Sequence, residues 1–177
     1  MKFSTKEDIE APIGDAFKMF TDFDQFERSA LRRGAQVSRT DSLNLKGSGM
    51  TWHTKFKLRG KERKINAEIV EYNEPENYCL ELHSDDVVAF ATLDLMSLSK
   101  SRTRASFAVE LKPKSLSGRL MVQTMRLGKS RLEKRFKTRT AEFVRVLERD
   151  YKSGTKACQS NIAFRGSRVG AKYSHLA

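Results

Sequence analysis

Residues 115–151 read SLSGRLMVQTMRLGKSRLEKRFKTRTAEFVRVLERDY, the longest periodic segment of the chain, and they contain no proline. Mostly apolar residues recur there at intervals of three and four, the spacing of one face of an α-helix. The members of this seam are Met121, Met125, Gly128, Leu132, Phe136, Thr140, Phe143, Leu147 and Tyr151. The pattern predicts a single long helix, and a helix of this length needs a partner surface for its apolar face.

The segment before this helix supplies the partner surface. From Gln36 to Pro113 apolar residues alternate with polar ones, which indicates β-strands with one buried and one solvated face. Glycines, asparagines and a proline separate the alternating runs and predict six strands, at 36–42, 49–58, 63–72, 77–84, 87–98 and 102–112. The short connections between them favour an antiparallel meander.

The first 34 residues add one strand and two short helices. Residues 2–11 alternate in the same way, and Pro12 follows where the first turn of a helix tolerates proline. Apolar residues at helical spacing then predict one helix after Pro12 and a second that ends at Gly34. This order predicts an α+β protein in which a curved, seven-stranded antiparallel sheet wraps around the long C-terminal helix.

The composition indicates one domain with its own hydrophobic core, since the chain has 177 residues. Its two cysteines, Cys79 and Cys158, match no metal-binding spacing, and Lys2, Lys6 and Glu7 interrupt any leader. We therefore expect a reduced, cytoplasmic protein with no metal or cofactor, and no apolar run approaches the roughly 20 residues that cross a bilayer. The net charge of +12 fits nucleic acid, anionic lipid or an anionic ligand as a partner, or an ordinary basic surface.

Residues 152–177 differ from the rest of the chain in having five Lys or Arg, no acidic residue and no sustained period. Such a composition is typical of a flexible tail. We therefore divide the chain into a folded domain at 1–151 and a basic, flexible tail at 152–177. Isolated apolar residues such as Ile162 and Phe164 leave a docked or membrane-touching peptide as the alternative.

The residues IEAPIGDAFKMFTDF at 9–23 place a proline between a strand and an apolar helix that ends in an Asp-rich turn. Together with the element order, this stretch resembles the START-like (SRPBCC) superfamily, which includes birch-pollen-allergen relatives and the polyketide cyclase and dehydrase group. A second match is the glycine-containing link formed by Lys46, Gly47, Ser48 and Gly49. The resemblance covers residues 1 to about 151 and implies a helix-grip fold around a cavity for lipids, sterols, polyketides or other apolar ligands. Only some members of the superfamily are enzymes.

The inward face of the expected sheet and the helix seam supply the candidate ligand-binding residues. A curved sheet closed by one helix leaves volume that an apolar ligand can fill, although ordinary core packing also explains each of these side chains. The candidates are Trp52, Phe56, Tyr78, Leu82, Phe90, Phe107, Met121, Met125 and Leu132. Glu7 and Asp94 are the polar residues expected to point into the cavity and to orient a ligand.

Basic residues gather at one expected end of the sheet. In the helix-grip arrangement the hairpin near 59–63 and the link near 112–116 meet at this end. The resulting basic rim consists of Arg59, Lys61, Arg63, Lys112 and Lys114. Such a rim attracts anionic lipid headgroups or retains an anionic amphiphile. Nucleic acid is the weaker candidate partner, because the chain has no helix-turn-helix, zinc-finger or ribonucleoprotein motif.

No arrangement of nucleophile and base is visible, so no catalytic residue is predicted. His53, His83 and Cys79 fall on the solvated face of their strands, and nothing in the local sequence would activate them. The sequence therefore favours a protein that binds or transports a small apolar or amphiphilic, lipid-like ligand without covalent chemistry. The alternatives are an enzyme similar to polyketide cyclases and dehydratases, and an electrostatic binding module for anionic membrane or nucleic acid.

Overall fold

The structure is a computed structural model that describes residues 1–58 and 60–166, apart from the side chains of residues 58, 61 and 155–166. Strand β1 (Lys2–Ile9) leads into helices α1 (Ile13–Phe20) and α2 (Phe23–Arg32). The strands that follow are β2 (Gln36–Arg39), β3 (Thr51–Leu58), β4 (Lys61–Asn73), β5 (Asn77–His83), β6 (Val87–Ser99) and β7 (Arg102–Pro113). Helices α3 (Leu116–Leu127) and α4 (Lys129–Gly166) complete the described chain.

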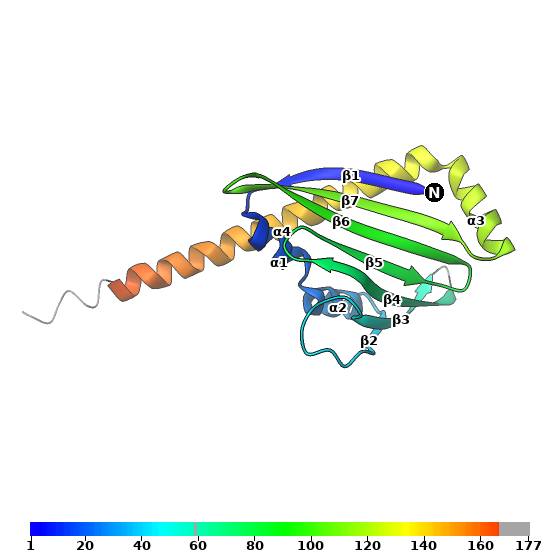
Figure 1. Cartoon of the computed structure of the whole chain (residues 1–177), viewed down its shortest axis with the longest axis horizontal. Helices are drawn as coiled ribbons and strands as arrows, with labels where there is room; N and C mark the ends of the chain where they lie inside the picture. Colours follow the sequence, from blue (N-terminus) through cyan, green and yellow to red (C-terminus); the bar gives the residue numbers. More distant parts are fainter. Residues whose placement is uncertain (59, 167–177) are drawn as a thin grey trace, which may run out of the picture.

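One antiparallel sheet organises the molecule, with its seven strands in the order β1-β7-β6-β5-β4-β3-β2. Strands β2 to β6 each pair with the next strand along the chain, and β1 lies at the edge beside β7, with Lys2 opposite Glu110. The two short helices follow the first strand, and the long helix ends the described chain (Figure 1). The predicted α+β architecture of the helix-grip type is therefore confirmed.

Alternation along the strands gives the sheet two chemically different faces. Trp52, Ala67 and Leu82 are cross-strand neighbours on one face, and the pairing of Leu93 with Phe107 extends that face across β6 and β7. We call this side the inner face, because the helices pack against it. The opposite, outer face is largely polar. It carries Thr51, His53, Glu68, Glu81 and Glu110.

Helix α1 fills one end of the inner face. Phe20 is 1% exposed, and its ring centroid lies 5.5 Å from that of Phe107 and 6.1 Å from that of Phe143. Val144 and Leu147 of α4 belong to the same buried cluster. The main core is therefore formed by α1, the sheet and one part of α4, which fixes the C-terminal helix to the body of the protein.

The single helix predicted over 115–151 is wrong, because two helices meet at Gly128. Gly128 is the C-terminal cap of α3, and its N–H donates to the carbonyl oxygen of Met125 at 3.2 Å. Glycine within a helix costs about 1 kcal/mol relative to alanine, so the chain changes direction there at little cost. Helix α3 consequently turns away from the line of α4 (Figure 1).

The apolar seam is buried only in its C-terminal part. Thr140 and Leu147 are buried, and Phe143 packs against the main core. Met121 precedes the break at Gly128 and is 42% exposed. The seam therefore predicted the packing of α4 correctly and that of α3 incorrectly.

The domain boundary predicted at Tyr151 does not coincide with the end of a helix. The backbone of α4 continues to Gly166, and Lys152 donates to a carboxylate oxygen of Glu10 at 2.6 Å. A folded domain at 1–151 with a flexible tail stays a prediction. Residues 167–177 lie outside the described chain.

Helix α3 is held to the sheet at its N-terminal end. The Ser115 hydroxyl accepts the N–H of Gly118 at 2.9 Å and donates to Asp86 Oδ1 at 2.8 Å. Hydrogen bonds from Ser117 and Ser115 lower the pKa of Asp86 below its usual value. A Cβ atom on Gly118 would lie 2.1 Å from the backbone oxygen of Asp86, so this close approach requires glycine.

Candidate ligand-binding site

An apolar cavity of about 250 Å³ lies between helix α2 and the inner face of strands β2 to β5. Most of the side chains around it are aliphatic or aromatic, as in sites that bind small apolar molecules. They are Phe23, Phe26, Glu27, Ala30, Val37, Trp52, Thr54, Ala67, Tyr78, Leu80 and Leu82. The cavity lies apart from the main core, beside a second buried cluster of the molecule.

Helix α2 forms one wall of this cavity. Phe23, Phe26 and Ala30 recur at helical spacing and therefore face the sheet together. The Phe23 ring centroid lies 5.4 Å from that of Trp52 and 5.9 Å from that of Tyr78. These aromatic contacts hold α2 against the strands, and they fix the shape of the wall that a ligand would meet.

The sheet forms the opposite wall, and its small residues explain why space remains. Ala67 lies between Trp52 and Leu82 across three adjacent strands. Ala30 faces the same space from α2. Larger side chains at these two alanine positions would reach into the volume, whereas the methyl groups leave it open.

Glu27 is the acidic residue at the cavity. It lies on α2 and is half-buried, and the indole Nε1–H of Trp52 donates to its Oε1 at 2.5 Å. The Tyr78 hydroxyl donates to the backbone oxygen of Phe20 at 3.3 Å, and burial raises the pKa of Tyr78 to about 12. The cavity thus combines apolar walls with one carboxylate, whose position is fixed by a hydrogen bond.

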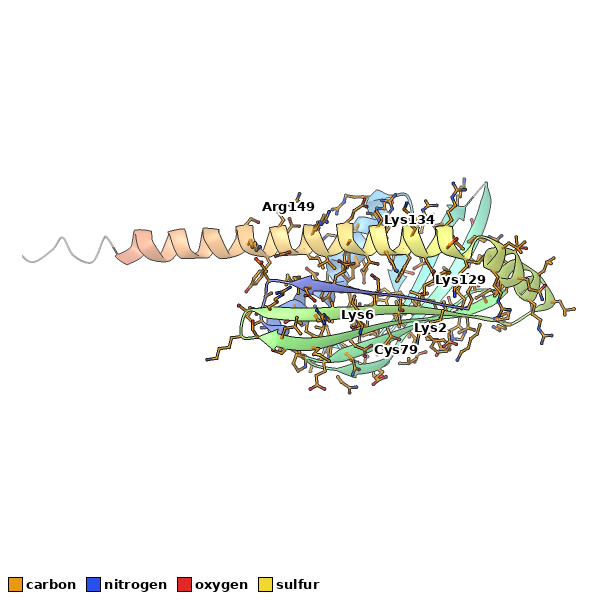
Figure 2. All side chains as sticks on the ribbon, turned by 90° about the horizontal axis from the view of Figure 1, so that it is seen from above. Lys2, Lys6, Cys79, Lys129, Lys134 and Arg149 are labelled. Atoms are coloured by element: carbon orange, nitrogen blue, oxygen red, sulfur yellow. The ribbon has the colours of Figure 1, made fainter. Side chains whose placement is uncertain are left out.

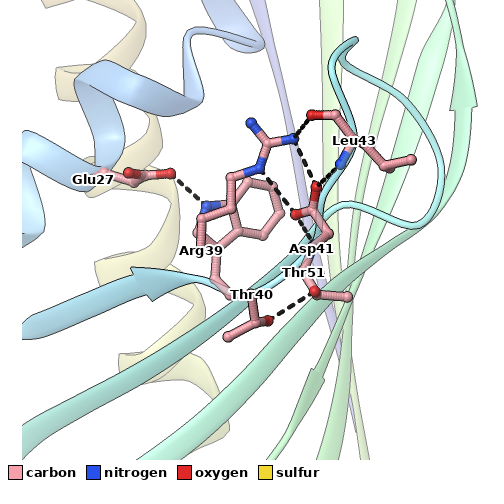
Figure 3. A network of polar contacts seen from close by, with 7 residues as sticks. Glu27, Arg39, Thr40, Asp41, Leu43 and Thr51 are labelled. Atoms are coloured by element: carbon pink, nitrogen blue, oxygen red, sulfur yellow. Dashed lines mark hydrogen bonds and ion pairs between the residues drawn. The ribbon is translucent and has the colours of Figure 1, made fainter.

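A second polar network supports the strand next to Trp52 (Figure 3). Arg39 Nε and Nη2 donate to the two carboxylate oxygens of Asp41, at 2.9 and 2.8 Å. The backbone N–H groups of Leu43 and Thr51 donate to the same carboxylate, each at 2.9 Å. These bonds, above all those from Arg39, hold the pKa of Asp41 well below its usual range.

The depressed pKa of Asp41 predicts a loss of stability in acid. Because the carboxylate is favoured in the folded state, its contribution is present at neutral pH and is lost as the pH falls through the folded-state pKa. We expect the urea concentration at the midpoint of unfolding to decrease once the pH is below about 4. In Asp41→Asn this decrease with pH should be less steep. Asp94→Asn, at an exposed position, is the matched control. Parallel pH profiles for the wild type and Asp41→Asn would contradict this account.

Three of the nine predicted ligand-binding residues line the cavity: Trp52, Tyr78 and Leu82. Phe107 is on the inner face but packs in the main core beside Phe20. Phe56 borders a separate hollow beyond the end of α2. The inner face was therefore assigned correctly for all five, although only part of it borders the cavity.

Phe90 lies on the outer face, contrary to the prediction. It pairs with Glu81 on β5 and with Glu110 on β7, and Lys112 Nζ lies 4.5 Å from the centroid of its ring. Strand β6 has apolar residues on both sides, so alternation did not reveal which side faces the helices.

The helix candidates Met121, Met125 and Leu132 do not line the cavity. Met121 and Met125 belong to α3, which turns away at Gly128 and packs mainly against β7 and α4. Leu132 is partly buried near the start of α4. The prediction placed them inside because it assumed one straight helix along the whole sheet.

The two acidic candidates occupy different faces. Glu7 pairs with Ala105 and lies on the inner face, where the Thr5 hydroxyl donates to its Oε1 at 3.4 Å, but it does not border the cavity. Asp94 pairs with Ser106 on the outer face and is exposed, so its assignment to the cavity was wrong. The error again arose because the sequence did not show which residues of β6 face the helices.

The predicted basic rim is described in part. Arg59 lies outside the described residues, and Lys61 is described in its backbone alone. Arg63, Lys112 and Lys114 are exposed. The strand register brings the β3–β4 hairpin, the β5–β6 connection and the end of β7 to the same end of the sheet, so Arg63 and the start of α3 lie at that end.

Of the residues that the structure describes, His53, His83 and Cys79 lie on the outer face, away from the cavity. His53 Nδ1 lies 2.6 Å from Asn66 Oδ1, and His83 Nε2 lies 3.0 Å from Glu81 Oε1. The Thr92 hydroxyl donates to the sulfur of Cys79 at 3.8 Å. None of these three side chains belongs to the lining of the cavity.

Sequence reasoning missed the contribution of α2 to the site, and Glu27 with it. The spacing of Phe23, Phe26 and Ala30 is visible in the sequence and predicted an apolar helix face. Glu27 is adjacent to that face, four residues after Phe23. The signal was present, but only the tertiary structure shows that this face meets Trp52 across an open space.

No protein-family model and no curated protein matches this sequence. Solved structures do match the fold. A protein of Thermus thermophilus is 11% identical with a TM-score of 0.59, covering 87% of this chain and 99% of its own. A conserved protein of Geobacillus kaustophilus is 12% identical with a TM-score of 0.57, covering 86% and 96%. The Zhui aromatase/cyclase of Streptomyces sp. R1128 is 8% identical with a TM-score of 0.51, covering 65% and 69%.

These likenesses define the class of fold. The chain has a START-like, SRPBCC-type helix-grip fold, as the resemblance at residues 9–23 implied. Among the helices in the described part of the chain, none is long and apolar enough to cross a membrane.

Proposed function

We propose that this protein binds or transports a small apolar or amphiphilic ligand in the cavity between α2 and strands β2 to β5, without covalent chemistry and in the cytoplasm. The observation that carries the proposal is the cavity itself, which is walled by aromatic and aliphatic side chains and borders one carboxylate. The START-like fold supports it, since the superfamily encloses apolar ligands in this architecture.

The size and polarity of the cavity restrict the ligand. Its volume of about 250 Å³ is slightly below the roughly 300–1,000 Å³ typical of ligand sites. A molecule with one or two rings, or a short acyl chain, suits this space. Glu27 favours a ligand that carries a hydrogen-bond donor, such as a hydroxyl or an amine, because a carboxylate oxygen accepts hydrogen bonds.

A second candidate function is an enzyme similar to polyketide cyclases or dehydratases, and Glu27 is the observation that favours it. A carboxylate beside an apolar ligand is able to act as a general base if the ligand presents an acidic proton within hydrogen-bond distance. Recovery of chemically unchanged ligand after prolonged incubation supports binding alone. Formation of a product that disappears in Glu27→Gln supports the enzyme.

Filling the cavity should weaken ligand binding. Ala30→Leu places a larger side chain in the space and is expected to raise the dissociation constant about tenfold or more, since each buried methylene contributes about 0.8 kcal/mol. Trp52 is the single tryptophan of the chain and lines the cavity, so its fluorescence reports occupancy. Titration would use alkyl alcohols, fatty acids, isoprenoid quinones and aromatic polyketides.

The matched control is Ala108→Leu, which enlarges an alanine on the outer face. It should leave both the Trp52 emission and the dissociation constants unchanged. Native mass spectrometry after gentle purification tests the same proposal without a chosen ligand. An unchanged Trp52 emission across the whole panel, with no co-purifying small molecule, would contradict the proposed function.

A further inference from the structure

Helix α3 exposes a row of leucines. Leu116, Leu120 and Leu127 are 80%, 66% and 90% exposed. At 100° per residue their positions fall within about 40° of one another around the helix, so they share one face. Three large aliphatic side chains, exposed together on a helix of twelve residues, form an apolar patch that marks an interaction site.

The opposite face of α3 holds the helix on the protein. Gly118 and Val122 are buried, and Gly118 lies against the backbone of Asp86. The leucine row therefore points away from the sheet and is available to a partner. Helix α3 lies at one end of the molecule, beyond β7, where a flat surface can reach it (Figure 1).

The charges around α3 determine which kind of partner fits. Residues 112–132 contain no aspartate or glutamate and six basic residues: Lys112, Lys114, Arg119, Arg126, Lys129 and Arg131. Arg119 and Arg126 lie on one flank of the leucine row, about 60–120° from its members around the helix. Lys129 begins α4, and further basic residues follow along that helix, including Lys134 and Arg149 (Figure 2). The partner must therefore be apolar and negatively charged at once.

We propose that α3 is a docking helix for an anionic lipid surface. The helix would lie in the plane of the interface, with the leucine row inserted among the acyl chains and with Arg119 and Arg126 at the level of the phosphates. A second copy of this chain fits less well, because a symmetric contact through α3 would bring the same arginines together, and α3 itself carries no acid to pair them. The inference stands whether or not the cavity beside α2 holds a ligand.

Vesicle co-sedimentation of the full chain tests this surface. The vesicles are phosphatidylcholine alone, and a mixture of phosphatidylcholine with anionic phosphatidylglycerol. We expect binding to the anionic vesicles that weakens with salt, and about tenfold weaker binding for the double variant Leu120→Ser, Leu127→Ser. The matched control is Leu45→Ser with Met96→Ser, two apolar side chains that are similarly exposed elsewhere. The control should bind like the wild type.

A charge-matched pair tests the arginines. Arg119→Gln with Arg126→Gln should weaken binding to anionic vesicles about tenfold, whereas Lys18→Gln with Lys100→Gln removes the same charge elsewhere and should have little effect. Equal sedimentation of the leucine variant and the wild type would overturn the proposal. Sedimentation velocity tests the rival occupant: a wild-type dimer that the leucine variant abolishes would assign the row to a second copy and would also overturn it.

Discussion

Replacing Phe20 with alanine is expected to lower the free energy of unfolding by about 3–5 kcal/mol. Phe20 is 1% exposed and contacts Phe107 of the sheet and Phe143 of α4. Its ring therefore joins α1, the inner face and the C-terminal helix at one point. Removal of the ring leaves a cavity among three elements that cannot all close on it. Urea unfolding followed by circular dichroism measures the loss.

Phe90→Ala is the matched control for this experiment. The Phe90 ring lies on the outer face, and its described partner is Lys112, whose Nζ is 4.5 Å from the ring centroid. A cation–π contact at such a site contributes about 0.5–1 kcal/mol, so the control should be destabilised by much less than Phe20→Ala. Similar losses in the two variants would contradict the assignment of the two faces.

The strands of the sheet were predictable because the alternation of apolar and polar residues is visible within each short stretch of sequence. In β3, apolar residues such as Trp52 alternate with polar ones such as His53, and each side chain is found on the expected face. Alternation is sufficient wherever one side of a strand is solvated. On β6 both sides are apolar, and the faces of Phe90 and Asp94 were assigned wrongly for that reason. The side of such a strand is decided by its neighbours, which a single strand does not reveal.

The C-terminal helix shows a different limit of sequence reasoning. The intervals from Met121 to Tyr151 are regular through Gly128, so periodicity alone predicted one helix. The break itself lies at Gly128, and the contact between Gly118 and Asp86 holds α3 at the end of the sheet while α4 follows β1. These partners lie 32 positions apart in the chain, and the contact is a property of the folded state. The exposed leucine row of α3 was missed for the same reason.

The candidate site depends on both kinds of information. Trp52, Tyr78 and Leu82 were found from strand alternation, whereas the other wall required the packing of α2 on the sheet. Whether Ala30 and Ala67 face empty space or a neighbouring side chain is settled only when the two walls are brought together. The hydrogen bond between Trp52 and Glu27 joins residues 25 positions apart, and it places the carboxylate where a ligand would meet it.

Glu27 is expected to control which apolar ligands bind. A fatty acid brings a second carboxylate near Glu27, and juxtaposed like charges cost several kcal/mol in a partly buried site. The corresponding alcohol is neutral and donates a hydrogen bond to the same oxygen. At neutral pH we therefore expect decanol to bind at least about tenfold more tightly than decanoate, when each dissociation constant is divided by the solubility of its ligand in water. Isothermal titration calorimetry gives both constants without depending on the emission of Trp52.

Glu27→Gln removes the charge while keeping an amide oxygen that can accept the Trp52 indole N–H. The variant should therefore bind decanoate more tightly and bring the ratio of the two constants close to one. Glu68→Gln removes the same charge from the outer face and should leave the ratio unchanged. If neither ligand binds the wild type, the proposed ligand binding in the cavity is contradicted. The proposal that α3 docks on a lipid surface does not depend on this result. If both ligands bind and the ratio is the same in all three proteins, Glu27 has no part in selection, although the cavity remains a binding site.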